Sequence, residues 1–526
     1  MRILYKIANK LFRIVKKILK LLTSRMVIIG VALLLEFCWL AGIMMQLNEK
    51  SVYINYAVTI LSLIAVLSII NNPKMNPGYK LMWAVCILAL PVTGICLYGI
   101  LGHSSVARKF RTHYDTVLLS QGGVLGEEEE TRKKLEEENI LAAGQSSYLT
   151  NYAHYPVYEN TETEYYPLGD VWFEHFIEEL KKAEHYIFME YFIISEGYLW
   201  DTVLEILKEK AAAGVDVRVI YDDFGCVTTL PYQYYKSLQQ MGIKCAAFNQ
   251  FRPVLNVILN NRDHRKIAVI DGHTAFTGGI NLADEYINRK ERFGHWKDSG
   301  ICLHGEAVWS FTVMFLQMWS TITGVECNFE SYRPEIYHEE AFKKDGFVQP
   351  YGDSPLDGET VGEHVYLNII SQAKKYLYIF TPYLIPDNET LTALCMAAKR
   401  GVDVRIVTPG IPDKKIVYIL TQANYEILLE SGVQIYQYTP GFIHSKSFVC
   451  DDEVATVGTI NMDYRSMYLH FECGVWMYGS SAVAQVKEDA LTTFEQCEQI
   501  NMDYCRKKNF AVRALRGALK FLAPLL

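Results

Sequence analysis

The chain has few of the features that mark metalloproteins or disulfide-stabilised proteins. Nine of its 12 cysteines follow residue 115, an odd number without a C-x-x-C pair or scaffold-like spacing. No cluster of histidine and cysteine has the spacing of a zinc site. We therefore expect no metal and no cofactor. Cysteine usage of this kind is typical of a reducing compartment, which favours a catalytic region on the cytoplasmic side.

Basic residues are scarce outside the N-terminal part of the chain. Residues 1–115 carry 14 Lys or Arg and 3 Asp or Glu, whereas the remaining residues carry 37 and 56. A region this acidic is a poor electrostatic partner for a nucleic acid backbone. We therefore expect no nucleic acid ligand.

Charged residues are almost absent from three apolar runs, at about residues 26–47, 52–70 and 81–101. Each run has about the length of a helix that spans a bilayer core. Glu36 is the exception, because an ionised carboxylate in mid-membrane is unfavourable. The runs predict a transmembrane region at residues 26–101 and therefore a multi-pass protein of the cell membrane.

Acidic residues are also absent from residues 1–25, which carry eight Lys or Arg with apolar residues at helical spacing. This pattern predicts a basic amphipathic helix on an anionic membrane surface, and residues 506–526 have a similar character. Residues 102–150, which include a highly charged stretch, are predicted to be a linker.

The side of the membrane on which catalysis occurs is ambiguous in the sequence. Three full crossings from a cytoplasmic N-terminus would place the catalytic region outside. Arg108, Lys109 and Arg111, which follow the last run, argue instead for the inside. Two crossings would resolve this conflict, and we expect the catalytic region on the cytoplasmic face.

One short pattern, His-x-Lys-x-x-x-x-Asp, occurs twice. A glycine follows each histidine by 14 residues and an asparagine follows it by 17. A single His-x-Lys is common by chance, but two copies with identical downstream offsets indicate a shared function. The first copy comprises His264, Lys266, Asp271, Gly278 and Asn281, and the second comprises His444, Lys446, Asp451, Gly458 and Asn461.

The two copies supply the groups that phosphoryl transfer through a phosphohistidine needs. In a strand, residues i and i+2 share a face, so the histidine and lysine of one copy project to the same side. One imidazole could attack phosphorus while the other protonates the departing alkoxide. The lysines and asparagines would stabilise charge on the phosphate oxygens. Asp271 and Asp451 close their strands, and we interpret them as structural members of the motif.

Each such histidine needs a carboxylate to hold its second ring nitrogen. Asp298 follows His264 by 34 residues, and Glu472 follows His444 by 28. We therefore expect Asp298 to orient His264 and Glu472 to orient His444. The other eleven histidines, including His273, His295 and His470, are interpreted as surface or satisfied core residues.

The duplication extends beyond the motifs. AEHYIFMEYF from Ala183 parallels AKKYLYIFTPYL from Ala373, and GVDVR occurs at both Gly214 and Gly401. In each half strand-like segments alternate with helix-like ones, which predicts an α/β sandwich. We place one lobe at residues 151–340 and the other at residues 341–505.

These residues resemble the phospholipase D superfamily, and within it the bacterial cardiolipin synthases. MEYFIISEG from Met189, TPYLIPD from Thr381 and both motif regions carry the resemblance, which runs from about residue 52 to the C-terminus. It implies two tandem phospholipase D-like α-β-α lobes that share one active site, preceded by N-terminal transmembrane helices.

The resemblance also implies an activity. The enzyme would transfer the phosphatidyl group of one phosphatidylglycerol to a second and release glycerol, with anionic membrane lipids as partners. We expect His264 to be the nucleophile and His444 the general acid and then base, although a pseudo-symmetric site allows either assignment. The sequence does not indicate an oligomeric state.

Two alternatives remain open. A hydrolytic phospholipase D, or a transphosphatidylase with a different alcohol acceptor, would use the same paired histidines, lysines and asparagines. A membrane scaffold with a decayed site is the other, and intact motifs in both halves argue against it.

Overall fold

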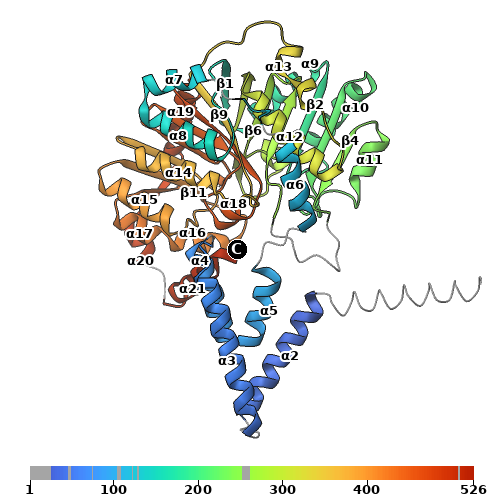
Figure 1. Cartoon of the computed structure of the whole chain (residues 1–526). Coiled ribbons are helices and arrows are strands. Elements are labelled where there is room, and N and C mark those ends of the chain that lie inside the picture. The colour runs from blue at the N-terminus through green and yellow to red at the C-terminus, as the bar shows by residue number, and fades with distance from the viewer. Residues whose placement is uncertain are drawn as a thin grey trace, which may run out of the picture. The chain divides into compact units, whose positions relative to one another are not determined.

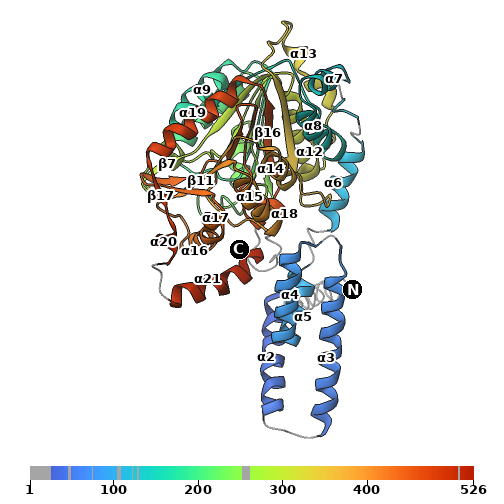
Figure 2. The same cartoon turned by 90° about the vertical axis from the view of Figure 1, so that its left-hand side faces the viewer.

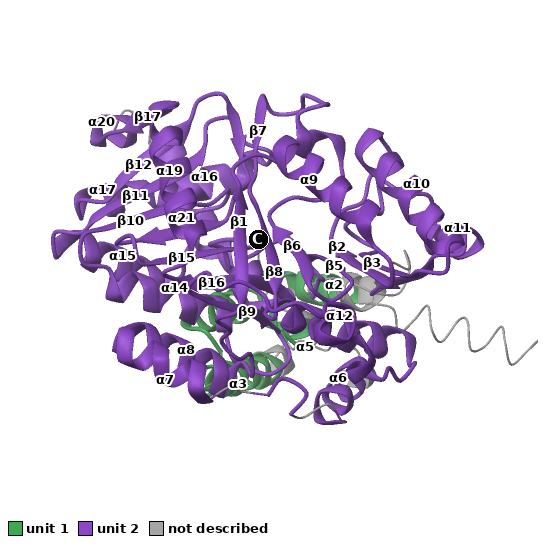
Figure 3. Cartoon of the chain, turned by 90° about the horizontal axis from the view of Figure 1, so that it is seen from above, with its two compact units in different colours: residues 1–106, 251–260 green, residues 107–250, 261–526 purple. Residues whose placement is uncertain are grey.

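The computed structural model describes residues 25–44, 49–73, 75–102, 108–120, 123–126, 129–250, 261–506 and 510–525. The basic helix predicted at residues 1–25 lies outside the described residues, except for Arg25. The chain divides into two compact units, residues 1–106 with 251–260 and residues 107–250 with 261–526 (Figure 3).

The first unit consists of apolar helices. They are α2 (Arg25–Met44), α3 (Glu49–Ile70), α4 (Pro77–Ala89) and α5 (Pro91–Leu101). Among the described residues, Val52–Ile70 in α3 is the one helical stretch with the length and mean hydropathy (2.1) of a membrane-crossing segment. The N-terminal apolar helix predicted at residues 52–70 is therefore confirmed.

The single helix predicted at residues 81–101 is wrong. The chain breaks at Leu90 (φ −133°, ψ 76°), and Pro91 begins a second helix because it has no N–H to continue the first. At about 1.5 Å per residue, α4 and α5 are each much shorter than a bilayer core of about 30 Å. A Cβ at Gly94 would lie 2.6 Å from the Cys86 carbonyl oxygen, so α4 and α5 contact one another closely.

Glu36 of α2 has a structural partner in the same unit. Its Oε2 accepts a hydrogen bond of 2.7 Å from the backbone N–H of Thr93, in the first turn of α5. A carboxylate at this position satisfies a free N–H and interacts favourably with the helix dipole. The charge within the first apolar run therefore caps the N-terminus of α5.

The second unit contains two sheets with the same strand order. The first is β1-β8-β6-β5-β2-β3-β4, and the second is β9-β16-β15-β14-β10-β11-β12 with β17 added at the β12 edge. The first-sheet strands are β1 (Thr161–Tyr166), β2 (Tyr186–Tyr191), β3 (Asp216–Asp222), β4 (Lys244–Phe248), β5 (Lys266–Ile270), β6 (Thr274–Gly278) and β8 (Gly300–Gly305). The second-sheet strands are β9 (Phe347–Asp353), β10 (Tyr376–Phe380), β11 (Asp403–Pro409), β12 (Gln434–Tyr438), β14 (Ser447–Cys450), β15 (Val454–Gly458), β16 (Glu472–Tyr478) and β17 (Cys497–Ile500).

Helices cover both faces of each sheet (Figures 1 and 2). One face of the first sheet carries α9 (Gly169–Lys182), α10 (Tyr198–Ala212) and α11 (Tyr234–Gln240), and the other carries α12 (Val308–Thr323). The equivalents on the second sheet are α14 (Val361–Gln372), α15 (Asn388–Lys399) and α17 (Tyr425–Glu430), with α19 (Ser481–Glu495) opposite. The predicted pair of α-β-α lobes is confirmed.

Further helices pack on the lobes. The predicted linker contains α6 (Arg108–Ser120), α7 (Glu129–Glu138) and α8 (Ile140–Tyr152), and Leu135 and Leu149 enter the core of the second lobe. The C-terminal segment forms α20 (Met502–Arg506) and α21 (Phe510–Leu522). The second of these packs on α16 (Lys415–Ala423).

Candidate active site

The two motifs meet where the lobes contact each other. The backbone N–H of His264 donates to the carbonyl of Phe471 (2.9 Å), and that of His444 donates to the carbonyl of Lys297 (2.7 Å). In addition, the short strands β7 (His295–Lys297) and β13 (Gly441–Ile443) pair in parallel across the lobes. Each motif histidine therefore lies beside the residue that precedes the carboxylate of the other lobe.

The predicted pairing of carboxylates with histidines is wrong, because the partners are exchanged between the lobes. Nδ1 of His264 lies 2.9 Å from Oε2 of Glu472, and Nδ1 of His444 lies 2.6 Å from Oδ2 of Asp298. Both carboxylates are fully buried. With Nδ1–H donating to a carboxylate, Nε2 of each imidazole carries the free lone pair.

Burial and local charge set the protonation of these pairs. Burial lowers the pKa of His264 well below its usual value, and it lowers the pKa of His444 to about 4 with a further contribution from Lys446. Burial alone would raise the pKa of Asp298 and Glu472, but the facing histidines hold both pKa values below the ordinary range. The two carboxylates are therefore the ionised members of these pairs.

The two motif lysines are buried in the same electrostatic environment. Nζ of Lys266 donates to the backbone carbonyl of His264 (2.6 Å), and Nζ of Lys446 lies 2.8 Å from Nδ1 of His444. Burial lowers the pKa of Lys266 to about 8 and that of Lys446 to about 7, and Lys266 contributes to the second shift. Both lysines also interact with Asp298 and Glu472, so the four groups share one site.

The two motif glycines allow close backbone approach. A Cβ on Gly278 would lie 2.4 Å from the Ser299 carbonyl oxygen, and one on Gly458 would lie 2.5 Å from that of Cys473. Those carbonyls belong to the residues that follow Asp298 and Glu472. Glycine therefore lets each motif strand pack directly against the segment that carries an orienting acid.

The two motif asparagines differ in their surroundings. Oδ1 of Asn281 accepts from the backbone N–H of Ile193 (3.0 Å), and its Nδ2 donates to the hydroxyl of Tyr286 (2.8 Å). Asn461 is also buried, but its Oδ1 has no hydrogen-bond partner. The amide of Asn281 is therefore tied to the framework by two hydrogen bonds, whereas no such bond holds Oδ1 of Asn461.

Asp271 and Asp451 have equivalent structural positions at the far ends of the motif strands. The carboxylate of Asp271 accepts three backbone N–H groups, from residues 184–186, at 2.7–2.8 Å. The carboxylate of Asp451 accepts three from residues 374–376 at 2.6–2.8 Å. Both residues have positive φ (48° and 57°). They fix the turn after each strand, in agreement with a structural interpretation.

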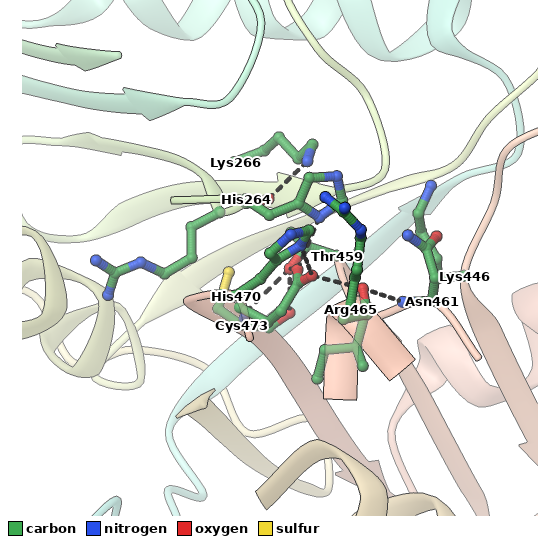
Figure 4. Close-up of polar contacts among 12 residues, drawn as sticks. His264, Lys266, Lys446, Thr459, Asn461, Arg465, His470 and Cys473 are labelled. Carbon is green, nitrogen blue, oxygen red and sulfur yellow. Dashed lines mark hydrogen bonds and ion pairs between the residues drawn. The ribbon is translucent and has the colours of Figure 1, made fainter. Parts of the chain in front are cut away.

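The structure adds residues that the motif spacing did not indicate. Thr459 and Ser466 donate to the two oxygens of Glu472, at 2.5 and 2.6 Å. Arg465, from α18 (Tyr464–Tyr468), lies among His264, His470 and Asn461 in Figure 4. His470 was expected to be a surface or satisfied core residue, and this is wrong. Its ring lies 5.5 Å from that of His264, and neither ring nitrogen has a hydrogen-bond partner.

A cation site can be considered at the same place. Ligand atoms of His264, His470 and Glu472 lie within 4.8 Å of one another, and no other described residues form such a group. However, the buried ammonium groups of Lys266 and Lys446 face the same site and oppose a cation there. The charge distribution fits an anion such as a phosphodiester better than a metal ion.

Two lobes of equal strand order, each contributing a histidine, a lysine and an acid to one site, define a two-lobed protein of phospholipase D type. A family model described as cardiolipin synthase, phospholipase D-like domain, matches residues 176–319 and 366–493. A second model, phospholipase D-nuclease N-terminal, matches residues 60–103. The match includes both motifs and the apolar N-terminal region.

Curated relatives agree with this result. The chain is 34% identical to a cardiolipin synthase of Alkalihalophilus pseudofirmus, over 89% of this chain and 92% of that protein. A cardiolipin synthase of Halalkalibacterium halodurans is also 34% identical, over 86% of this chain and 90% of that one. An uncharacterized protein of Streptococcus mutans is 43% identical, over 88% of this chain and 99% of that protein.

A solved structure shows the same fold. The phosphatidylserine synthase of Haemophilus influenzae superposes with a TM-score of 0.54 at 15% identity, over 73% of this chain and all of that one. Together with the matches in sequence, this establishes the family. The chain belongs to the phospholipase D-like cardiolipin synthases.

Proposed function

We propose that this chain is a cardiolipin synthase, a phosphatidyltransferase that joins two molecules of phosphatidylglycerol and releases glycerol. The observation that carries the proposal is the exchange of carboxylates between the lobes. Glu472 of the second lobe holds His264, and Asp298 of the first holds His444. Neither lobe alone completes a catalytic pair, so both histidines serve one substrate.

In the first step, Nε2 of His264 attacks the phosphorus of one phosphatidylglycerol. The bond between phosphorus and the glycerol headgroup oxygen breaks, and this oxygen takes a proton from Nε2 of His444. Glycerol leaves, and the phosphatidyl group remains on His264. The anionic substrate favours the protonated form of His444, whose pKa is low in the free protein.

In the second step, the headgroup hydroxyl of another phosphatidylglycerol gives its proton to His444. Its oxygen attacks phosphorus, the phosphorus–nitrogen bond breaks, and cardiolipin leaves with His264 restored. Lys266 and Lys446 stabilise the charge on the non-bridging oxygens in both steps, and the side-chain NH2 of Asn461 donates to them.

Product analysis tests this function. The purified full chain in mixed micelles of detergent and phosphatidylglycerol should form cardiolipin and glycerol in equal amounts. Phosphatidic acid as the main product would identify a hydrolytic phospholipase D. A new phosphatidyl ester formed only after addition of another alcohol would identify a different acceptor, and no product at all would support a scaffold.

We further propose a multi-pass arrangement with the catalytic region on the cytoplasmic face. In this arrangement α2 and α3 cross the membrane, whereas α4 and α5 form a re-entrant hairpin, because neither has the length to cross alone. The hairpin lets the chain leave on the side of its basic N-terminus, which agrees with the basic residues at positions 108–111. Epitope tags at the N-terminus and at Gly126 should both be protected in intact spheroplasts. Exposure of one tag alone would contradict the topology.

A further inference from the structure

The two half-sites differ at one position that the duplication makes equivalent. His470 precedes Glu472 by two residues, and Trp296 precedes Asp298 by two. Each of these rings lies beside the catalytic histidine of the other lobe. The ring of His470 is 5.5 Å from that of His264, and the ring of Trp296 is 5.7 Å from that of His444. One histidine thus faces a third imidazole, whereas the other faces an indole that cannot carry charge.

His470 also lies beside Glu472, the acid that orients His264. Its Nδ1 lies 3.5 Å from Oε1 of Glu472, while His264 uses Oε2 of the same carboxylate. The side chain of His470 is only 11% exposed. By contrast, the equivalent acid Asp298 has no such second ring beside it. It interacts with His444, with Lys446 and with the backbone N–H of Ser299.

We propose that His470 is a positioning residue of the first half-site, which favours the unprotonated form of His264 and so assigns it the role of nucleophile. This inference rests on the proposed transferase mechanism. The physical reason is twofold. A second imidazole on Glu472 reduces the share of negative charge that could stabilise protonated His264, and a protonated His470 repels a second positive charge nearby.

Other charged groups face the same histidines and have to be considered. His264 faces Glu472 and Lys266 besides His470. His470 faces Glu472 and Asp463, and Arg465 lies nearby in Figure 4. Lysines are present in both half-sites and do not distinguish them. His470 differs from these groups, because the equivalent position in the other half-site is occupied by Trp296, which cannot titrate.

The test is the pH dependence of kcat/KM for cardiolipin formation by the full chain in phosphatidylglycerol micelles. In His470→Asn, we expect the acid limb, which reports protonation of the nucleophile, to move up by about one pH unit. The loss of activity should therefore be larger at acid pH than at pH 8. His470→Lys, which places a permanent positive charge at this position, should return the acid limb to the wild-type position or below it. Trp296→Phe, the matched change in the other half, should leave the acid limb in place.

Two results would overturn the inference. An acid limb that stays at the wild-type position in His470→Asn would show that His470 does not influence His264. An equal loss of activity at every pH, shared by the Asn and Lys variants, would show that the ring only fills space. Both outcomes are separable from failure of the transferase proposal, because that proposal requires wild-type protein to make cardiolipin and glycerol whatever the pH profile of the variants.

Discussion

The two lobes share a scaffold but differ in the side chains around their histidines. Both lobes share the strand order and the motif geometry. In both, the motif aspartate, Asp271 or Asp451, also accepts hydrogen bonds from the start of the neighbouring strand, β2 or β10. His264, however, contacts the rings of Phe192 and His470, whereas His444 contacts an aromatic wall. That wall comprises Tyr286, Trp296 and Phe442. Duplication accounts for the presence of two imidazoles, and divergence of their neighbours gives the two imidazoles different chemical properties.

The largest effect is expected from removal of either histidine. His264→Ala and His444→Ala should each lower kcat for cardiolipin formation by about a thousandfold or more, because each loses a group that acts in both steps. His295→Ala is a suitable control, because His295 forms its hydrogen bond with the Tyr438 hydroxyl, outside the site. Circular dichroism should show all three variants folded, and substantial product from either active-site variant would remove that histidine from the mechanism.

The exchange of acids between the lobes predicts the next largest effect. Glu472→Gln should lower kcat by about a hundredfold or more, because the amide no longer fixes the tautomer of His264. In this variant, the extent of labelling by diethyl pyrocarbonate, mapped by mass spectrometry, should change at His264 and not at His444. Asp298→Asn should give the reverse pattern. Altered labelling of the histidine in the same lobe as the mutated acid would contradict the exchange.

A smaller effect on kcat is expected from the asparagines, and it should differ between the two halves. Asn461→Ala should lower kcat by about tenfold to a hundredfold, because in the proposed mechanism its amide donates to the phosphate. Tm should change little, because no hydrogen bond holds Oδ1 of Asn461. Asn281→Ala should instead lower the free energy of unfolding by about 1–3 kcal/mol, since it leaves the Ile193 N–H and the Tyr286 hydroxyl unpaired. Equal effects of both variants on Tm would show that the difference between the asparagines is not real.

The smallest expected effect concerns the lysines and the pH dependence of kcat/KM in the alkaline range. Both pKa values are lowered by burial, to about 8 for Lys266 and about 7 for Lys446, so positive charge in the free protein is lost as pH rises through this window. kcat/KM should therefore fall above about pH 7–8. Lys446→Arg, which keeps its charge, should move the basic limb to higher pH. A flat profile up to pH 10 would contradict the assignment of charge to these lysines.

The sequence was sufficient for the pair of α-β-α lobes and for the family. Matched offsets from His264 and His444 led to both lysines and both glycines, whereas the two acids follow their histidines at unequal distances of 34 and 28 residues. It did not show which acid faces which histidine, because that depends on backbone pairing between lobes, such as His264 with Phe471, which chain distance does not encode. The role of His470 depends on the same contact between lobes.

In the apolar region, a local signal in the sequence marks the break between α4 and α5. Pro91 lies in the middle of the third run, and proline within an apolar helix pattern indicates a break. The partner of Glu36 could not be found in this way, because Thr93 lies 57 residues further along the chain.

The most direct test of the central claim, that one histidine from each lobe acts on a single phosphorus with a distinct role, uses a substrate that needs no acid to release its leaving group. With phosphatidyl p-nitrophenol, His444→Ala should release about one equivalent of p-nitrophenol in a burst and then stop, with the phosphatidyl group attached to His264. His264→Ala should give no burst. A burst from His264→Ala with the adduct on His444, or steady turnover by either variant, would contradict the account.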